Sequence, residues 1–263
     1  MTPGFDNRTI LGHEFAGVVA EVGADVEHVK TGQRVVCTST ISDGPCAHCR
    51  AGRVSQCLGR ALFGYSGVYP RLDGGHAELV RVPHADRCLL ALPDEVDDES
   101  AIFLADILPT GFGAVARGGV SAGDMVVVVG CGPVGLMAVM CAADIAGTLI
   151  AVDGVAERRK IAERLGAQAV APEEATTVVA DATAQLGADV VIEAAGSPGA
   201  LDLALRLTRG RGLGSEIRHR IATSFLQQLR RGGSIQPASS PIDSRSMPRP
   251  RLIGSSTAAK RQR

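Results

Sequence analysis

The pattern of apolar and polar residues changes once along the chain, near residue 121. Before that point, short apolar runs are separated by Gly and Pro, which predicts strands at Gly17–Val22, Gln33–Val36 and Ala77–Val82 joined by loops. After it, wholly apolar runs alternate with helical patterns, which predicts a parallel sheet with helices on both faces. We therefore expect an α/β protein with two domains.

The second part of the chain repeats a strand–helix unit. Strands are predicted from Met125, at Leu149–Val152 and at Asp189–Ile192. Helices are predicted at Ala156–Leu165, where Gly166 ends the helix, and from Pro198 to about Leu207, where Ser197 is the N-cap. This alternation is typical of a doubly wound parallel sheet.

A glycine turn follows the strand that begins at Met125. It matches G-x-G-x-x-G, and Asp153 ends the next strand at the roughly 20-residue offset of a dinucleotide-binding unit. Such glycines allow a tight turn, a close backbone approach to a pyrophosphate and close helix–strand packing. Asp153 favours NAD over NADP as an acceptor for the ribose hydroxyl, although Arg158 and Arg159 weaken that preference. The candidate cofactor-binding residues are Gly130, Gly132, Pro133, Val134, Gly135 and Asp153.

Two other interpretations compete for residues 125–143. The segment carries no charge and is long enough for a membrane span. However, its Gly-Pro cluster breaks a continuous helix, and no basic flank or aromatic belt accompanies it. A glycine turn without a nucleotide is the second interpretation, and it leaves Asp153 unexplained. We predict a nucleotide site and no membrane span.

The composition bears on the compartment. The chain has 263 residues, 45% of them hydrophobic, with 32 Gly and 7 Cys. Met1–Ile10 lacks the apolar core of a signal peptide, so we expect a cytoplasmic protein. In a reducing compartment, cysteines are expected to be thiols or metal ligands rather than disulfides.

The chain beyond Thr208 departs from the strand–helix pattern. Residues 209–263 carry a net charge of +10, and the rest of the chain carries −11. Ile221–Leu229 has some helical periodicity, while 233–263 is rich in Ser, Pro and Arg, which is typical of disorder. A sheet with no strand after Thr208 has an exposed edge. We expect a tail translated from a shifted reading frame; nucleic-acid binding is less favoured, because no recognisable module is present.

A loop rich in Gly and Pro carries four closely spaced side chains that bind metals. Asp43, Cys46, Cys49 and Cys57 have the spacing D-x2-C-x2-C-x7-C. Three thiolates this close are typical zinc ligands, and a carboxylate is usable although less favoured. Two alternatives stay open: Cys37 replaces Asp43 as a ligand, or the site is degraded by the loss of one cysteine.

Five motifs in order give the chain a resemblance to a known family. They are Gly-His-Glu at 12–14, the cysteine loop at 43–57, Gly-Gly-His-Ala-Glu at 74–78, Asp-Ile-Leu-Pro-Thr-Gly at 106–111 and the glycine turn at 130–135. Over about residues 9–208 the chain resembles the zinc-dependent medium-chain alcohol dehydrogenases. The resemblance is strongest to the branch with an aspartate as third catalytic ligand, which includes formaldehyde and secondary-alcohol dehydrogenases.

The resemblance implies an architecture. Residues 1–113 would form a partial, N-terminally truncated catalytic domain that is β-rich and similar to chaperonin-10. Residues 114–208 would form an incomplete Rossmann domain with a doubly wound parallel sheet. Residues 209–263 would be a basic, disordered tail.

The resemblance also implies residue roles. His13 and Asp106 would bind the catalytic zinc, Glu14 would lie in or beside its coordination shell, and Thr110 would lie near the nicotinamide. The four side chains of the 43–57 loop would hold a structural zinc. The implied chemistry is Lewis-acid zinc acting on the oxygen of an alcohol or aldehyde substrate while hydride passes between substrate and NAD.

The chain departs from the family at both ends. Members carry a cysteine ligand upstream of Gly-His-Glu, whereas no cysteine precedes Gly12 here, and members continue the nucleotide sheet past the position of Thr208. A catalytic zinc normally has three protein ligands and an open position. Two functions therefore stay open: an NAD-dependent zinc dehydrogenase, or a non-catalytic fragment that binds nucleotide or zinc. The family also implies a homo-oligomer, and the departures at the two ends of the chain count against that expectation.

Overall fold

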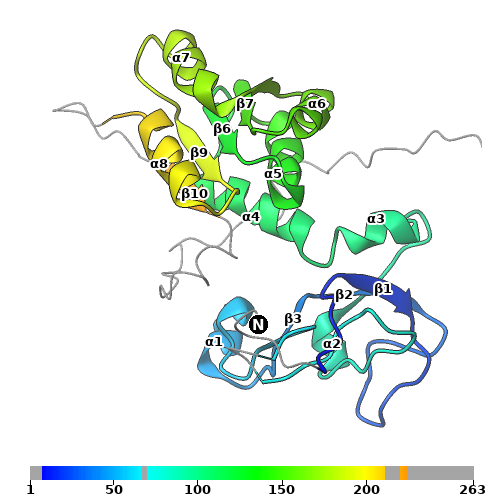
Figure 1. Ribbon diagram of the computed structural model, residues 1–263. Helices are drawn as coiled ribbons and strands as arrows, with labels where there is room; N and C mark the ends of the chain where they lie inside the picture. Colours follow the sequence, from blue (N-terminus) through cyan, green and yellow to red (C-terminus); the bar gives the residue numbers. More distant parts are fainter. Residues whose placement is uncertain (1–7, 67–69, 211–219, 224–263) are drawn as a thin grey trace, which may run out of the picture. The chain divides into compact units, whose positions relative to one another are not determined.

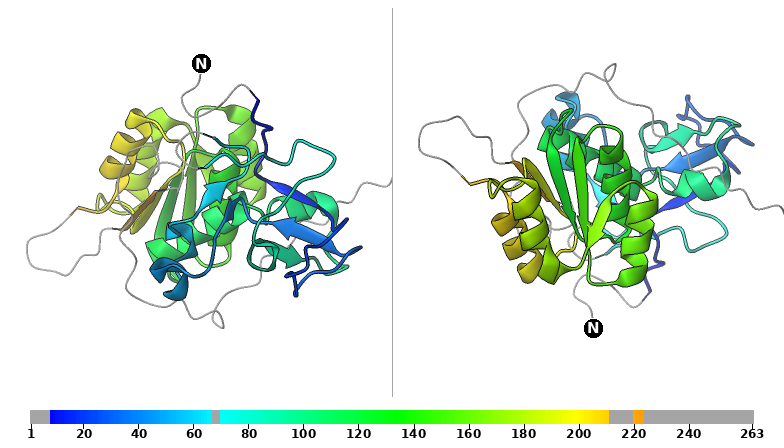
Figure 2. Two further views of the ribbon diagram at one scale, coloured as in Figure 1. Left: turned by 90° about the horizontal axis from the view of Figure 1, so that it is seen from below. Right: turned by 90° about the horizontal axis from the view of Figure 1, so that it is seen from above.

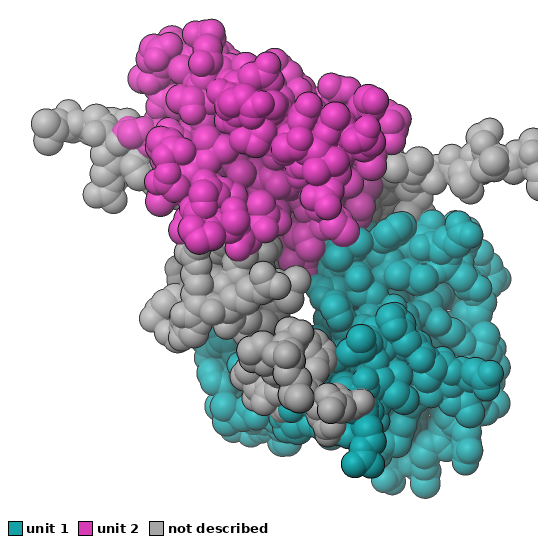
Figure 3. Space-filling model, in the orientation of Figure 1, with its two compact units in different colours: residues 1–109 teal, residues 110–263 magenta. Residues whose placement is uncertain are grey.

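The computed structural model describes residues 8–66, 70–210 and 220–223. The chain divides into two compact units, 1–109 and 110–263, which Figure 3 colours separately. The division between Pro109 and Thr110 lies close to the predicted domain boundary at 113/114. Most of the predicted tail at 209–263 lies outside the described residues.

Unit 1 is built from short strands and short helices. β1, β2 and β5 form an antiparallel sheet, and β3 pairs antiparallel with β4. In chain order the elements are β1 (Phe15–Val18), β2 (Arg34–Cys37), β3 (Thr40–Ile41), α1 (Ala47–Arg50), η1 (Val54–Gln56), β4 (Ala61–Leu62), α2 (Ala85–Cys88), β5 (Leu89–Ala91) and α3 (Asp98–Ile102) (Figure 1). The strand predicted at Gln33–Val36 is confirmed as β2, and the one predicted at Gly17–Val22 begins and ends earlier, as β1.

The strand predicted at Ala77–Val82 is wrong. The structure describes these residues as loop. Val80 and Val82 pack on the core around Phe63, while Leu79 is 78% exposed. The alternating pattern therefore indicates correctly that one side of this segment faces the core. None of these residues pairs with a strand in the described part of unit 1.

Unit 2 contains a five-stranded parallel sheet in the order β10-β9-β6-β7-β8. Helix α4 (Ile107–Gly118) leads into it. The remaining elements are β6 (Met125–Val129), α5 (Pro133–Ala143), β7 (Thr148–Val152), α6 (Ala156–Arg164), β8 (Gln168–Val170), α7 (Pro172–Ala182), β9 (Val190–Glu193), α8 (Pro198–Leu207) and β10 (Arg220–Thr223). Figure 2 shows helices along both faces of this sheet, as the sequence predicts.

The central strand β6 separates two apolar cores. Val126 and Val128 pack on one side with residues of α4, α5 and α6, whereas Val127 and Val129 pack on the other with residues of α7 and α8. All five residues of β6 are buried. A strand covered on both faces explains why this segment is continuously apolar rather than alternating.

Two sequence expectations for unit 2 need correction. The helical periodicity predicted over Ile221–Leu229 is wrong for 221–223, which belong to β10; the rest of that range lies outside the described residues. The expected bare sheet edge beside β9 is also wrong, because β10 pairs with β9 over Arg220–Thr223. Residues 125–143 form a strand and a helix, and no described helix is long and apolar enough to cross a bilayer.

Candidate functional site: a dinucleotide turn and two groups of metal-binding side chains

The three glycines of the turn after β6 differ in what a side chain at each position would meet. Gly130 has φ +96°, and a Cβ there would lie 2.7 Å from the backbone nitrogen of Ala195. A Cβ on Gly135 would overlap the carbonyl oxygen of Gly130. Nothing lies within 4 Å of a Cβ on Gly132. The protein's own packing therefore requires the first and third glycines, while the second borders open space.

Helix α5 begins at this turn with its N-terminus uncapped. Gly132 is the N-cap and Pro133 occupies the first turn, and no side chain of the described residues accepts from the first-turn N–H groups. Val134 is half-buried and Pro133 is exposed. Free N–H groups and the positive end of the helix dipole favour an anion at this position.

Asp153 connects the end of β7 to the glycine turn. Its Oδ2 accepts from the backbone N–H of Cys131 at 2.7 Å, and its Oδ1 accepts from that of Val155 at 2.8 Å. Arg158 Nη1 lies 3.8 Å from Oδ2, and Arg159 donates to the backbone carbonyl of Asp153 at 2.8 Å. The side chain predicted to recognise the ribose therefore also fixes the turn that would hold the phosphates.

Sequence reasoning missed an acidic residue at the same edge of the sheet. Glu193 ends β9 and has no exposed surface. Its signal was present, since a glutamate directly follows the apolar run Val190–Ile192. The predicted strand at Asp189–Ile192 stops one residue before it.

His13 and Asp106, far apart in sequence, lie together in unit 1. His13 precedes β1 and Asp106 precedes α4, and His13 Nε2 is 3.3 Å from Asp106 Oδ2. The hydrogen bond from His13 to Asp106 raises the pKa of His13; burial opposes this rise, and the charges of Asp106 and Glu14 reinforce it. An imidazole nitrogen and a carboxylate oxygen at this separation are a usable pair of zinc donors.

Glycine motifs position His13. Gly12 has φ +95°, and a Cβ on it would lie 2.6 Å from Cδ2 of His76. Gly75 donates its backbone N–H to the carbonyl of Gly12 at 2.8 Å, and His76 donates to that of Leu11 at 2.9 Å. The motifs at 12–14 and 74–78, separate in sequence, therefore form one structural unit.

Glu14 and Thr110 take other positions. Glu14 Oε1 accepts from the backbone N–H of Ile107 at 3.3 Å, and it does not join His13 and Asp106 in a group of three close donors among the described residues. Thr110 lies in α4, which packs on α5: a Cβ on Gly111 would be 2.6 Å from the nitrogen of Ala138. Their predicted roles stay predictions.

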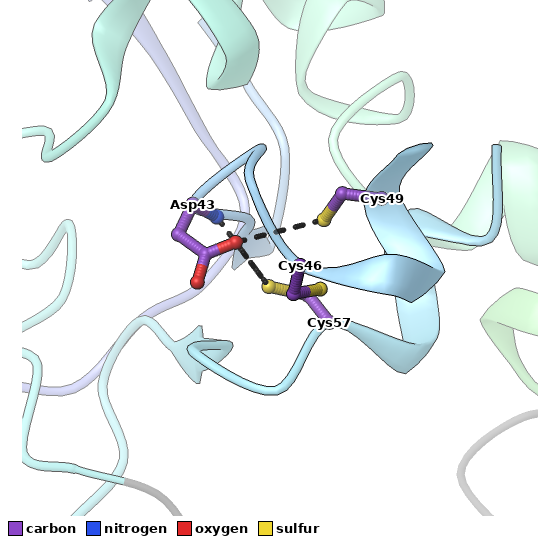
Figure 4. A group of neighbouring side chains, drawn as sticks. All are labelled: Asp43, Cys46, Cys49 and Cys57. Carbon is purple, nitrogen blue, oxygen red and sulfur yellow. Dashed lines mark hydrogen bonds between the residues drawn. The ribbon is translucent and has the colours of Figure 1, made fainter. Parts of the chain in front are cut away.

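The cysteine loop of unit 1 brings its four predicted ligands together. One donor atom from each of Asp43, Cys46, Cys49 and Cys57 lies within 4.8 Å of the others, the one such group in the described part of the chain. Figure 4 shows the side chains converging from the loop, α1 and the end of η1. Asp43 Oδ1 accepts from the Cys57 thiol at 3.2 Å and from the Cys49 thiol at 3.7 Å. Three sulfurs and one oxygen are a donor set that zinc accepts.

The thiols of this group differ in acidity. Backbone N–H groups, that of Leu58 above all, lower the pKa of Cys46 to about 7, whereas burial raises that of Cys49 to about 11. The Cys57 thiol lowers the pKa of Asp43. Cys37, the alternative ligand, packs instead beside Cys88, and burial raises its thiol pKa well above the ordinary value. The described group therefore contains Asp43 and not Cys37.

Two family models match the chain. A model described as alcohol dehydrogenase GroES-like domain matches residues 2–94, and one described as zinc-binding dehydrogenase matches residues 133–214. The medium chain reductase/dehydrogenase ucsI of Acremonium sp is 39% identical over 219 residues, which are 79% of this chain and 74% of that protein. The zinc-type alcohol dehydrogenase-like protein AdhB of Bacillus subtilis (strain 168) is 37% identical over 249 residues, 89% of this chain and 65% of that protein. The chain thus spans between about two thirds and three quarters of these two relatives.

Solved structures agree with these matches. The alcohol dehydrogenase TADH from Thermus sp. ATN1 superposes with a TM-score of 0.75 at 30% identity, covering 88% of this chain and 77% of that one. A protein of Sinorhizobium meliloti 1021 described as a zinc-binding dehydrogenase, solved with NADP bound, gives a TM-score of 0.70 at 31% identity, covering 85% and 70%. A GroES-like catalytic domain joined to a Rossmann domain is therefore the shared architecture.

Proposed function

The chain belongs to the zinc-type alcohol dehydrogenases of the medium-chain dehydrogenase family, and on that basis we propose that it transfers hydride between a small alcohol or aldehyde adduct and NAD. The observation that carries this proposal is the Gly130–Gly135 turn. It combines open space at Gly132, an uncapped helix N-terminus and an acidic residue at the end of β7. This is the arrangement that a dinucleotide needs.

The zinc-binding side chains of unit 1 support the same proposal. The 43–57 loop would hold a structural zinc, which closes a loop that has little regular structure of its own. His13 and Asp106 would be two ligands of a catalytic zinc, with Glu14 beside them. When bound, that metal supplies Lewis-acid polarisation of the substrate oxygen. Without the metal, the 3.3 Å contact between Asp106 and His13 holds the imidazole and the carboxylate side by side.

Asp153 supports NAD rather than NADP as the cofactor. Its carboxylate is 8% exposed and would repel a 2′-phosphate. Arg158, 3.8 Å away, offsets part of that charge. None of the seven cysteines is paired in a disulfide, which suits the cytosol as the proposed compartment.

The second candidate function is a non-catalytic protein that binds nucleotide or zinc. One observation favours it: in the described part of unit 1, His13 and Asp106 form a pair, and no third His, Cys, Asp or Glu joins them within metal-binding distance. A catalytic zinc normally has three protein ligands.

Metal analysis combined with cofactor titration separates these candidates. Purified chain is assayed for zinc by mass spectrometry, for NADH binding by fluorescence, and for NAD-dependent oxidation of primary and secondary alcohols and of formaldehyde. About two zinc ions per chain with turnover supports the dehydrogenase. NADH binding with about one zinc and no turnover supports the non-catalytic candidate. As a control, His13→Ala should abolish turnover and leave NADH binding and the loop zinc intact.

A further inference from the structure

A glutamate is buried where the strands of the parallel sheet end. Glu193 has no exposed surface and lies in register with Val129 of the central strand β6. Burial of a carboxylate costs free energy unless its oxygens receive hydrogen bonds. None of the zinc or cofactor roles described above uses this residue.

The side chain of Glu193 accepts its hydrogen bonds from one short turn. Its Oε1 accepts from the backbone N–H groups of Ala195 at 3.0 Å and Gly196 at 2.8 Å. Gly196 has φ +80°, so the chain bends sharply there. Oε2 is buried and has no hydrogen-bond partner in the described part of the chain. A carboxylate satisfied on one oxygen only is a poor source of stability, which points to a positional role.

The turn that Glu193 holds lies against the dinucleotide turn. Ala194 donates its backbone N–H to the carbonyl of Val129 at 2.8 Å. The backbone nitrogen of Ala195 would be 2.7 Å from a Cβ on Gly130, and the Cβ of Ala194 would be 3.4 Å from one on Gly135. Because the two turns lie this close together, a shift of residues 194–196 would displace the glycine turn.

We propose that Glu193 is a positioning residue of the dinucleotide site. It holds the 194–196 turn against the glycine turn from the β9 side of β6. Asp153 fixes the same turn from the β7 side, through the N–H of Cys131. Both carboxylates accept from backbone groups, so the phosphate-binding turn is shaped before the ligand arrives. This inference rests on the proposed binding of a nicotinamide dinucleotide.

Two substitutions at Glu193 separate positioning from general stability. In Glu193→Gln the side-chain oxygen still accepts from Ala195 and Gly196, whereas Glu193→Leu keeps a similar volume and loses both hydrogen bonds. We expect NADH to bind Glu193→Leu at least about tenfold more weakly, and Glu193→Gln within about threefold of the unchanged protein. The melting temperature of Glu193→Leu should not fall in proportion to the loss of NADH affinity, because removing a buried carboxyl group with one unpartnered oxygen offsets the loss of the two hydrogen bonds. Glu163→Leu, at an exposed position of α6, is the matched control and should change nothing.

Amide hydrogen exchange tests, without a cofactor, whether the 194–196 turn holds the glycine turn in place. In Glu193→Leu we expect faster exchange at residues 194–196 and also at 130–132. Gly196→Ala strains the same turn with Glu193 intact and should reproduce both effects, so the test does not depend on one variant folding. Unchanged NADH affinity and unchanged exchange at 130–132 in these variants would overturn the proposal, as would a loss in Glu193→Gln equal to that in Glu193→Leu. Failure of the unchanged protein to bind NADH would overturn the proposed function instead, and exchange at 130–132 would still decide this inference.

Discussion

The dinucleotide turn of unit 2 and the cysteine loop of unit 1 present their functional groups in opposite ways. At the turn the groups are backbone N–H donors beside the wholly buried strand β6, held in place by the carboxylates of Asp153 and Glu193. In the cysteine loop the groups are side chains in and beside α1 and η1, which have four and three residues. The turn is therefore shaped by the core, whereas the loop depends on the ion that its side chains would share.

The largest effect is expected from filling the glycine turn. Gly135→Val places side-chain atoms on the carbonyl oxygen of Gly130, so α5 must move away from β6. Overpacking of this kind costs about 3 kcal/mol of unfolding free energy. NADH binding should be lost as well. Urea unfolding and NADH fluorescence measure the two effects.

Gly132→Ala breaks binding without breaking the fold. A Cβ there meets nothing within 4 Å, and φ is −70°, so the unfolding free energy should stay within about 0.5 kcal/mol. The added methyl enters the space assigned to the pyrophosphate, so NADH affinity should fall by about tenfold or more. Gly199→Ala in α8, also with open space, is the control. Unchanged NADH affinity in Gly132→Ala would remove the phosphate site from this position.

Metal removal should loosen the cysteine loop of unit 1 and leave the parallel sheet of unit 2 unchanged. Chelation is expected to speed amide exchange across residues 43–59 by about tenfold or more, because little regular structure remains to protect them. Exchange in β6, β7 and β9 should not change. Cys57→Ser, which weakens a ligand that is 1% exposed, should mimic chelation. An equal rise in amide exchange across the parallel sheet would contradict the conclusion that only the cysteine loop depends on a metal ion.

Substitutions at Asp43 sharpen the dependence of the loop on its donors. Asp43→Asn removes a charged ligand and should weaken zinc binding by about tenfold, while Asp43→Cys supplies a fourth thiolate and should strengthen it. Competition with a coloured chelator measures both. Asp25→Asn, at an exposed position of the same unit, is the control. Equal zinc affinity in the two Asp43 variants and the Asp25→Asn control would show that Asp43 is not a ligand.

The smallest effect concerns the N-terminus of a helix in unit 1. Asp97 caps α3 by accepting from the backbone N–H and the hydroxyl of Ser100, and these bonds lower its pKa. Because the folded pKa is below the unfolded value of about 3.9, the stabilisation is complete above that pH. It is lost as pH falls through the folded pKa. Asp97→Asn should therefore flatten the acid side of the stability profile in denaturant titrations and leave NADH binding unchanged.

The N-termini of helices α3 and α5 differ, which is why Asp97→Asn should leave NADH binding unchanged. Helix α3 uses its own Asp97 side chain as a cap, whereas α5 begins at Gly132 with no side-chain cap. A steeper acid profile in Asp97→Asn than in the unchanged protein would show that the cap does not act as described. The uncapped terminus is the one that a phosphate would complete.

Features with local signals could be predicted from the sequence. The glycine turn, Asp153 and the four-residue metal group each depend on spacing within one loop or one strand–helix unit, and the structure brings the members of each together. Helix α7 also had local signals, Pro172 followed by Glu173 and Glu174, and sequence reasoning passed over them.

Features that depend on distant contacts could not be predicted. The spacing of Gly12 and Gly75 gives no sign that the backbone N–H of Gly75 donates to the carbonyl of Gly12. Ala77–Val82 has the alternation of a strand, but a strand also needs a neighbour, which the pattern does not report. Likewise the sequence shows Glu193 only as the end of a strand, and gives no sign of the turn whose backbone N–H groups donate to its side chain.

The central place of β6 has a consequence for biosynthesis. It is the first strand of its sheet to leave the ribosome, yet it lies between β7 and β9, and β9 begins about 60 residues later. At translation rates of about 5–20 residues per second, one edge of a Met-Val-Val-Val-Val strand stays unpaired for about 3–12 seconds. An uncharged, valine-rich edge of this kind pairs readily with other nascent chains. Yield in cells should therefore depend on chaperones that bind nascent chains more than the stability of the finished sheet suggests.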